Sequence, residues 1–289
     1  DRAALADVLE RLDSTNAQGE IYLTDALERI EGPVAALVAD DPDAAAGVND
    51  RVDLAACEAA LQQRLREDLM RGGVTMPDPS AVYVEAGVRV GRDTVVWPGT
   101  HLRGATTIGE GCTIGPDVVI TDSEIGDRCT IVSAHLIQAR LAEGAQAGPF
   151  AYLRPGSRLE PGARVGTYVE LKNTVLGAGA KVPHLSYVGD ATIGEKTNIG
   201  AGNITANYDG FRKHSTRIGA RVKTGSDCVF VAPVTVGDDA MTGAGSIITE
   251  DVPDGALGIA RARQSVVEGF TAKAVARAAQ AAEEAKGDA

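Results

Sequence analysis

Two cations in the middle of this 289-residue chain have a spacing that could bring them together. Arg154 directly follows Leu153, Lys172 directly follows Leu171, and the two cations are 18 residues apart. Two basic side chains held side by side can bind a phosphate group. They can instead splay into water or form an ion pair with Glu170. The spacing by itself leaves all three interpretations open.

His184 is the histidine with the most promising neighbours. It lies in the segment VPHLSYVGD, two places after Val182. Imidazole titrates near neutral pH and can take a proton from an amine. With Lys172, Tyr187 and Asn198 close to it, His184 is a candidate general base. Without such neighbours, an outward histidine would be an ordinary surface residue. The remaining histidines are expected to be solvated turn residues: His101, His135 and His214.

A repeat of six residues predicts the element that positions these side chains. Every sixth residue from 90 to 120 is aliphatic, and the spacing returns over 141–171 and 218–248, with a few steps of five elsewhere. Neither a helix nor an alternating strand has a period of six, but a hexapeptide β-helix does, with three hexads in each triangular coil. The sequence therefore predicts a mainly β chain with a parallel β-helix over residues 72–260, of about nine coils.

Eighteen residues make one coil, so Arg154 and Lys172 should stack on one face with their Cα atoms about 5 Å apart. If the two charges stayed that close, they would repel by about 3 kcal/mol at an effective dielectric constant near 20. A bound phosphate would relieve this repulsion. The segment from Arg154 to Lys223 has 11 basic and 5 acidic residues in a chain of net charge −12, which also favours a local anionic ligand.

The six-residue rhythm breaks between Ile199 and Ile218, over AGNITANYDGFRKHSTR. This segment is too long for hexads alone, and it contains the turn pair Asp209-Gly210. We expect a loop that projects from the β-helix. Such a loop can carry function or be a tolerated insertion.

The two ends of the chain differ from the middle. Apolar residues recur every three or four positions over 53–71, which predicts an amphipathic helix. The alanine-rich last ~20 residues favour a helical tail. The acidic net charge argues against nucleic-acid and anionic-membrane partners. The four separated cysteines are expected to be reduced thiols of a cytoplasmic protein, and no run of 18 apolar residues exists.

Several segments closely resemble one bacterial family. They are YLRPGSRL (152–159), GTYVELKNTVLG (166–177), VPHLSYVGDATIGEKTNIGAGNITANYDG (182–210) and GSDCVFVAPVTVGDDAMTGAGSIIT (225–249). The family is that of the bifunctional N-acetylglucosamine-1-phosphate uridyltransferase/glucosamine-1-phosphate acetyltransferases. The strings NAQGEIYLTD (16–25) and GVNDR (47–51) resemble the end of its nucleotidyltransferase domain.

The resemblance implies a left-handed coil and a homotrimer with active sites between subunits. It implies a remnant of the nucleotidyltransferase domain with a linker helix at 1–71, the acetyltransferase β-helix at 72–260 and a C-terminal tail at 261–289. The implied reaction moves an acetyl group from acetyl-CoA to the amine of glucosamine 1-phosphate, on the route to UDP-N-acetylglucosamine and the cell wall.

Residue roles follow by resemblance. His184 would be the catalytic base. Arg154 and Lys172 would bind the sugar phosphate, and Tyr187 and Asn198 would position the sugar. The positions that match acetyl-CoA contacts are Ala201, Asn207, Tyr208, Ser226, Ala244 and Arg261. Lys213 could meet a phosphate of CoA or be solvated.

The uridyltransferase half is represented by little more than Asn49, which matches a residue that helps to hold Mg²⁺. The carboxylate partner of that residue and the glycine-rich nucleotide loop of the family have no match. We therefore expect no uridyl transfer by this chain alone. Two other hypotheses remain: a hexapeptide-repeat acyltransferase that uses another amine, and a non-enzymatic β-helix spacer.

Overall fold

The computed structural model describes residues 2–15, 17–38 and 46–287, with side chains in the last helix described up to residue 283. The chain divides into two compact units, 1–60 and 61–289, whose boundary lies within one helix. The string NAQGEIYLTD begins at Asn16, which lies outside the described residues, as do the last two residues of the predicted tail.

The first unit holds short helices: α1 (Arg2–Leu9), η1 (Leu23–Asp25) and α2 (Ala26–Arg29). Val8 and Ala26 are its buried apolar residues among those described. The small number of buried side chains leaves this unit with little core of its own.

The predicted amphipathic helix is confirmed as α3 (Arg51–Arg71), but only part of its apolar face is covered, with Leu69 packed against the core. Leu54 and Leu61 are exposed, and the buried side chain is Gln62. Its carboxamide donates to the Val84 carbonyl (2.8 Å) and accepts from the Val84 N–H (2.9 Å). The first strand of the β-helix has an open edge whose backbone groups need partners, so a polar side chain serves here better than an apolar one.

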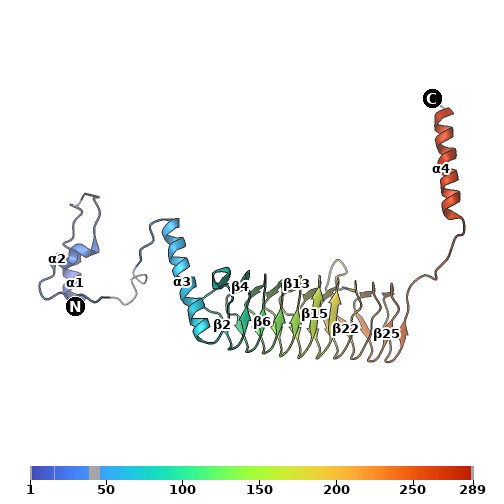
Figure 1. Ribbon diagram of the computed structural model, residues 1–289, viewed down its shortest axis with the longest axis horizontal. Helices are drawn as coiled ribbons and strands as arrows, with labels where there is room; N and C mark the ends of the chain where they lie inside the picture. Colours follow the sequence, from blue (N-terminus) through green and yellow to red (C-terminus); the bar gives the residue numbers. More distant parts are fainter. Residues whose placement is uncertain (1, 16, 39–45, 288–289) are drawn as a thin grey trace. The chain divides into compact units, whose positions relative to one another are not determined.

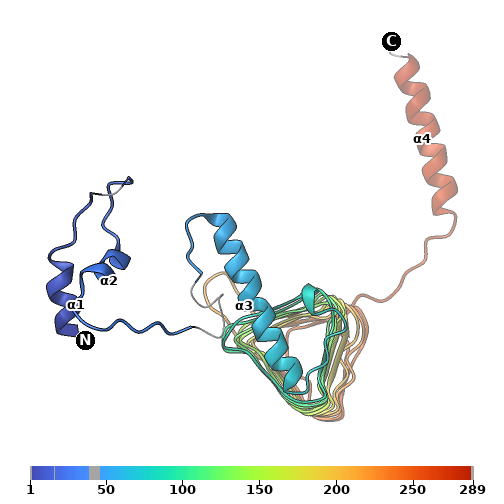
Figure 2. The same cartoon turned by 60° about the vertical axis from the view of Figure 1, so that its left-hand side comes forward.

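Between residues 82 and 258 the second unit is a parallel β-helix with three walls, seen end-on as a triangle in Figure 2. The chain visits the first, second and third wall in turn, and Figure 1 shows the coils side by side in sequence order. The first wall has ten strands: β1 (Val82–Val84), β4 (Thr100–Arg103), β7 (Val119–Thr121), β10 (Ala134–Ile137), β13 (Ala151–Leu153), β16 (Glu170–Lys172), β19 (Tyr187–Gly189), β21 (Ile204–Ala206), β23 (Val229–Val231) and β26 (Ile247–Ile248).

The second wall has nine strands, and the third is shared between a six-stranded and a two-stranded sheet. The second wall comprises β2 (Arg89–Val90), β5 (Thr107–Ile108), β8 (Glu124–Ile125), β11 (Arg140–Leu141), β14 (Arg158–Leu159), β17 (Val175–Leu176), β20 (Ala191–Ile193), β22 (Thr216–Ile218) and β24 (Val234–Val236). The third wall comprises β3 (Val95–Val96), β6 (Thr113–Ile114), β9 (Thr130–Ile131), β12 (Gln146–Ala147), β15 (Arg164–Thr167), β18 (Lys181–His184), β25 (Met241–Thr242) and β27 (Leu257–Gly258). Single bridges join Lys181, Asn198, Lys223 and Met241 between its two sheets.

The predicted hexapeptide β-helix is confirmed, and its inward residues form one continuous core. Leu102, Leu153 and Ile193, for example, are almost completely buried, and of the predicted inward series Val90 alone is only half-buried. The ten-stranded first wall makes about ten coils rather than nine. Close stacking also requires glycine at Gly166, where a Cβ would lie 2.0 Å from the Pro183 carbonyl oxygen.

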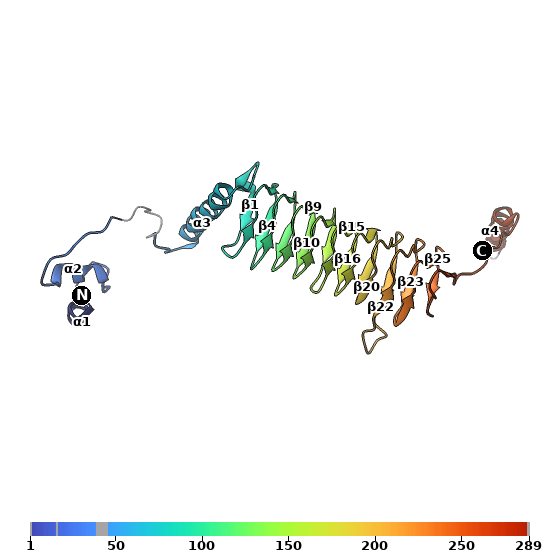
Figure 3. The same cartoon turned by 90° about the horizontal axis from the view of Figure 1, so that it is seen from below.

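The predicted loop is also confirmed. It occupies 207–215, between β21 and β22, and projects from the β-helix near β22 (Figure 3). The prediction of turn positions for His101 and His135 is wrong, because both lie on first-wall strands and face outward beside tyrosine rings. The remaining elements are η3 (Pro79–Ala81) and the tail helix α4 (Phe270–Gly287). Within the described ranges, no helix combines the length and apolar character needed to cross a bilayer.

The inward leucines should dominate stability. Leu153→Ala removes a fully buried side chain and should lower the free energy of unfolding by about 2–5 kcal/mol. Leu185→Ala makes the same chemical change at a corner where the leucine is 63% exposed, and should cost less than about 0.5 kcal/mol. Urea unfolding followed by circular dichroism measures both, and equal losses would contradict the inward assignment.

Candidate functional site

Arg154 and Lys172 lie on neighbouring rungs of the first wall, as predicted. Leu153 and Leu171 are paired between β13 and β16, so the cations that follow them emerge side by side. The Arg154 N–H donates to the Leu171 carbonyl (2.9 Å), which continues the ladder to that position. The 18-residue interval therefore does set the two charges on one face.

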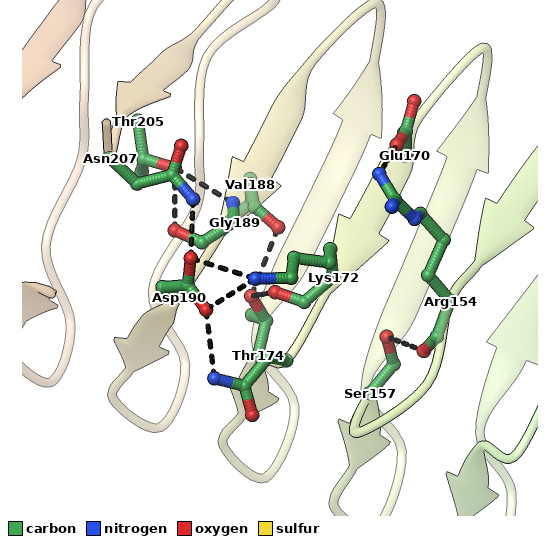
Figure 4. Close-up of polar contacts among 11 residues, drawn as sticks. Arg154, Ser157, Glu170, Lys172, Thr174, Val188, Gly189, Asp190, Thr205 and Asn207 are labelled. Atoms are coloured by element: carbon green, nitrogen blue, oxygen red, sulfur yellow. Dashed lines mark hydrogen bonds and ion pairs between the residues drawn. The ribbon is translucent and has the colours of Figure 1, made fainter. Parts of the chain in front are cut away.

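Carboxylates compensate both charges. Arg154 Nη1 lies 2.8 Å from Glu170 Oε1, and both side chains are about 40% exposed. Lys172 Nζ lies 2.8 Å and 3.0 Å from the two carboxylate oxygens of Asp190. The Glu170 interpretation thus holds for Arg154, while Lys172 has a partner that the sequence did not suggest. Figure 4 shows the two cations turned toward these different carboxylates.

Asp190 is the centre of a polar cluster formed with Lys172, Asn173 and Asn207, here called the Asp190 cluster, in which Asp190 and Asn207 are buried and Asn173 is exposed. Asn173 donates to Oδ1 of Asp190 (2.8 Å), and Asn207 donates to Oδ2. The Asp190 side chain is only 9% exposed. Burial by itself raises the pKa of Asp190, but the hydrogen bonds from Lys172, Asn173 and Asn207 outweigh it and hold the pKa below its usual value. The Asp190 hydrogen bond in turn raises the pKa of Lys172.

Tyr187 and Lys213 border this cluster. A Cβ at Gly189 would lie 2.4 Å from the Tyr187 hydroxyl and 2.9 Å from Asn207 Nδ2, so these two groups meet above Gly189. Lys213, in the 207–215 loop, has its pKa lowered by the neighbouring Lys172 ammonium. Three cations and two carboxylates therefore gather at this end of the first wall, with a net charge of +1.

His184 lies elsewhere on the coil. It ends β18 on the third wall, at the corner that leads into β19, and it is exposed. Arg154 and Lys172 lie at the opposite end of the first-wall strands. The structure joins neither His184 nor Asn198 to the Asp190 cluster within one chain, although the ladder does pair Asn198 with Lys181 of the His184 strand.

Three of the six predicted acetyl-CoA positions form a column with His184. The third-wall bridges make Lys181, Asn198, Lys223 and Met241 equivalent in successive coils. Three residues further on, the same register aligns four residues on one corner, here called the corner column: His184, Ala201, Ser226 and Ala244.

The contacts in the corner column are made by backbone. The Asp227 N–H donates to the Ala201 carbonyl (2.7 Å), and the Gly245 N–H donates to the Ser226 carbonyl (2.8 Å). Arg261 is exposed just beyond Ala260, whose carbonyl accepts from Ile247 (3.1 Å). Small side chains leave this corner open beyond His184.

Asn49 lies just before the first turn of α3. Its backbone N–H and side-chain amide both donate to Asp53 Oδ2, at 3.0 Å and 3.2 Å, while Asp50 caps the start of α3 through the N–H groups of Val52 and Asp53. These contacts are those of a helix N-terminus. In the part of the chain that is described, no three His, Cys, Asp or Glu side chains are grouped to hold a metal ion.

The sequence reasoning missed Asp190 and Asn173. A usable signal existed, because Asp190 stands 18 residues after Lys172, the same interval that joined Lys172 to Arg154. Asn207 was proposed only as a contact of acetyl-CoA. It stands 17 residues after Asp190, the same interval by which Tyr187 of β19 pairs with Ile204 of β21.

Comparison with known proteins agrees with this architecture. The model of the bacterial transferase hexapeptide (six repeats) matches residues 87–122, and that of the hexapeptide repeat of succinyl-transferase matches residues 215–250. The Bifunctional protein GlmU of Mycolicibacterium gilvum is 50% identical over 273 residues, which cover 93% of this chain and 55% of that protein. The GlmU of Corynebacterium glutamicum is 49% identical over 291 residues, 98% of this chain and 60% of that protein.

The chain is a GlmU-like hexapeptide-repeat protein. It spans 55–60% of the length of these two GlmU relatives. The predicted family resemblance is thereby confirmed along nearly the whole chain. Among solved structures, an Arabidopsis UDP-N-acetylglucosamine acyltransferase is 16% identical, with a TM-score of 0.39, over 65% of this chain and 66% of that one.

The Asp190 carboxylate should make stability depend on pH. Its pKa in the folded GlmU-like chain lies below the value of about 3.9 for an unfolded aspartate. Its contribution is therefore complete above about pH 4 and is lost as the pH falls through the folded pKa. The urea midpoint of Asp190→Asn should lie well below that of the wild type at neutral pH, and the gap should close in acid.

Asp93→Asn is the matched control, because Asp93 has a similar positive φ (60°, against 49° at Asp190) but is exposed. Its midpoint should follow that of the wild type at every pH. A gap for Asp190→Asn that stayed constant down to about pH 3 would show that the carboxylate charge is not what stabilises the cluster.

Proposed function

We propose that this chain transfers the acetyl group of acetyl-CoA to the amine of glucosamine 1-phosphate. The observation that carries the proposal is the stacked pair Arg154 and Lys172, beside Tyr187, on a β-helix that is about half identical to GlmU. Paired cations at fixed spacing suit a phosphorylated acceptor. Acetyl-CoA as donor follows from the family resemblance and from the corner column.

The sugar phosphate would bind at the cationic end of the first wall. An ammonium has three N–H donors, and Lys172 uses two on Asp190, which leaves one for a phosphate oxygen. Arg154 donates through Nη1 to Glu170, so its remaining N–H groups can reach the same phosphate. Tyr187 and Asn198 would orient the sugar ring.

His184 would act as the base. The amine of the acceptor must lose a proton before its lone pair attacks the thioester carbonyl, and a neutral imidazole can accept that proton. The new C–N bond forms as the C–S bond breaks, and the CoA thiolate leaves with a proton returned by His184. Thioester carbon, amine and base meet directly, so no covalent enzyme intermediate is needed.

The acetyl-CoA chain would lie along the corner column beyond His184, against Ala201, Ser226 and Ala244, with Arg261 near its far end. Asn207 and Tyr208 would reach it from the loop. Because His184 and the cation pair lie at opposite edges of the first wall, we propose the homotrimer of the family, in which neighbouring copies complete each site. In this assembly, glucosamine 1-phosphate and acetyl-CoA are the small-molecule partners.

The direct experiment is a two-part assay on the purified chain. Thiol release from acetyl-CoA should appear only when glucosamine 1-phosphate is added, while UTP with N-acetylglucosamine 1-phosphate should give no pyrophosphate. A panel of other amines tests the alternative of a different acceptor. The spacer hypothesis predicts that acetyl-CoA does not bind at all, which a calorimetric titration tests. Absence of both binding and turnover on any amine would favour the spacer and defeat the proposal.

Replacing the base should affect turnover more than binding. His184→Ala should lower kcat by about 10²–10⁴-fold, because the amine then loses its proton acceptor. His135→Ala removes another exposed histidine, on the first-wall strand β10, and should retain wild-type kcat. Steady-state kinetics at neutral pH decides the matter, and a wild-type rate in His184→Ala would remove this residue from the mechanism.

Removing one phosphate-binding cation should affect the acceptor selectively. Arg154→Ala should raise KM for glucosamine 1-phosphate by about 10- to 100-fold, since hydrogen bonds to charged groups contribute about 1.5–3 kcal/mol. KM for acetyl-CoA should change little. Arg140→Ala, which removes a similar ion pair with Glu124 on the second wall, is the matched control. Equal KM values for Arg154→Ala and wild type would refute the phosphate site.

A further inference from the structure

One buried carboxylate joins residues that the proposed function assigns to two different substrates. Lys172 would hold the phosphate of the acceptor, and Asn207 would contact acetyl-CoA. Both donate to Asp190. We propose that Asp190 couples the two binding sites, so that each substrate strengthens binding of the other. This inference rests on the proposed function, and it assigns Asp190 as a positioning residue.

The geometry makes Asp190 a link between coils. Lys172 ends β16, Asp190 directly follows β19, and Asn207 directly follows β21, so the three residues lie on three successive rungs of the first wall. Oδ1 accepts from Lys172 and Asn173, and Oδ2 accepts from Lys172 and Asn207. Figure 4 shows the Lys172 ammonium and the Asn207 amide both directed at the carboxylate. A movement of either Lys172 or Asn207 therefore disturbs the Asp190 carboxylate to which the other is bound.

Asn207 transmits this constraint to the loop. Its side chain is buried against Asp190, while the adjacent Tyr208 is 62% exposed. The Asn207 carbonyl accepts from the His214 N–H (2.8 Å), and Tyr208 and Lys213 form an antiparallel bridge. The position of Asn207 therefore sets both strands of the loop at their base. A ligand that orders the loop also orders the Asp190 cluster.

The sign of the coupling follows from shared ordering. A phosphate at Lys172 fixes the long lysine side chain and, through Asp190, the amide of Asn207. A CoA molecule that binds next then meets a loop that is already ordered, so less conformational freedom remains to be lost. Linkage requires the reverse effect to have the same size. We expect positive coupling of about fivefold or more.

Isothermal titration calorimetry on the full chain can measure this coupling without turnover. Coenzyme A, which has no acetyl group to transfer, is titrated with and without saturating glucosamine 1-phosphate. The ratio of its two Kd values is the coupling factor. In the wild type, we expect CoA to bind about fivefold or more tightly when glucosamine 1-phosphate is present.

Asp190→Asn is the decisive variant. An amide has one acceptor oxygen and one NH2 group, so it cannot accept from Lys172 and Asn207 on both sides. Asparagine also tolerates the positive φ of this position (49°). The coupling ratio should fall to about 1. Asn173→Gly removes a different bond to Asp190, leaves the Lys172 and Asn207 bonds in place and suits the φ of 47°, so it should keep the wild-type ratio.

The outcomes separate the inference from the proposed function. If neither ligand binds the wild type, the proposed function fails and this inference fails with it. If both ligands bind the wild type but neither changes the Kd of the other, only the coupling role of Asp190 fails. The same holds if Asp190→Asn keeps the wild-type coupling ratio. A coupling ratio of about 1 in Asn173→Gly would also overturn it. General loosening of the cluster would then be sufficient to abolish coupling, without a specific role for the Lys172 and Asn207 bonds.

A second variant covers the case in which Asp190→Asn does not fold. Asn207→Ser removes the amide that reaches Asp190 from the loop side and leaves the carboxylate paired with Lys172. Binding of CoA alone should weaken, yet the coupling ratio should still fall to about 1. A retained ratio in this variant would overturn the inference independently.

Discussion

The register between successive coils is the constraint on which the molecule depends. Backbone hydrogen bonds run from each coil to the next, and the inward side chains stack on their equivalents one coil away. An insertion of one residue that was not absorbed in a corner would turn a wall inside out, because side chains alternate between its faces. The same register carries every functional column, outward as well as inward. A site in this fold is therefore a ladder of residues from successive coils.

Stacking also places like charges next to each other, and the chain manages this with carboxylates on neighbouring rungs. Arg154 pairs with Glu170, and Lys172 pairs with Asp190. The first pair is half exposed and so contributes little to stability. The second pair is mostly buried, where an unpaired charge is costly, so its full set of hydrogen bonds is what makes the burial tolerable. In the proposed function, the exposed Arg154 exchanges its carboxylate for the phosphate of the acceptor, while the buried pair holds Lys172 in place.

The loop shows how the β-helix admits function without losing register. Nine residues, 207–215, leave the first wall after β21, and the chain resumes the second wall at β22, whose pairing with β20 is undisturbed. The buried amide of Asn207 anchors the departure point. Exposed residues such as Tyr208 and Phe211 can then reach beyond the wall. A rigid scaffold with one anchored loop is a common way to combine precise positioning with reach.

The sequence by itself determined the repeat, its inward residues and the stacking of Arg154 on Lys172, because a six-residue period has one geometric solution and needs no distant information. It also provided the family resemblance from which roles are proposed for His184, Ala201, Ser226 and Ala244. Only the tertiary structure decided which side chains form hydrogen bonds with which. Gln62 is buried on α3 because an open strand edge lies beside it, and Asp190 joins Lys172 to Asn207 because the three residues lie on successive rungs of the first wall. Such contacts depend on where separate segments meet, and a local pattern of residues does not encode that.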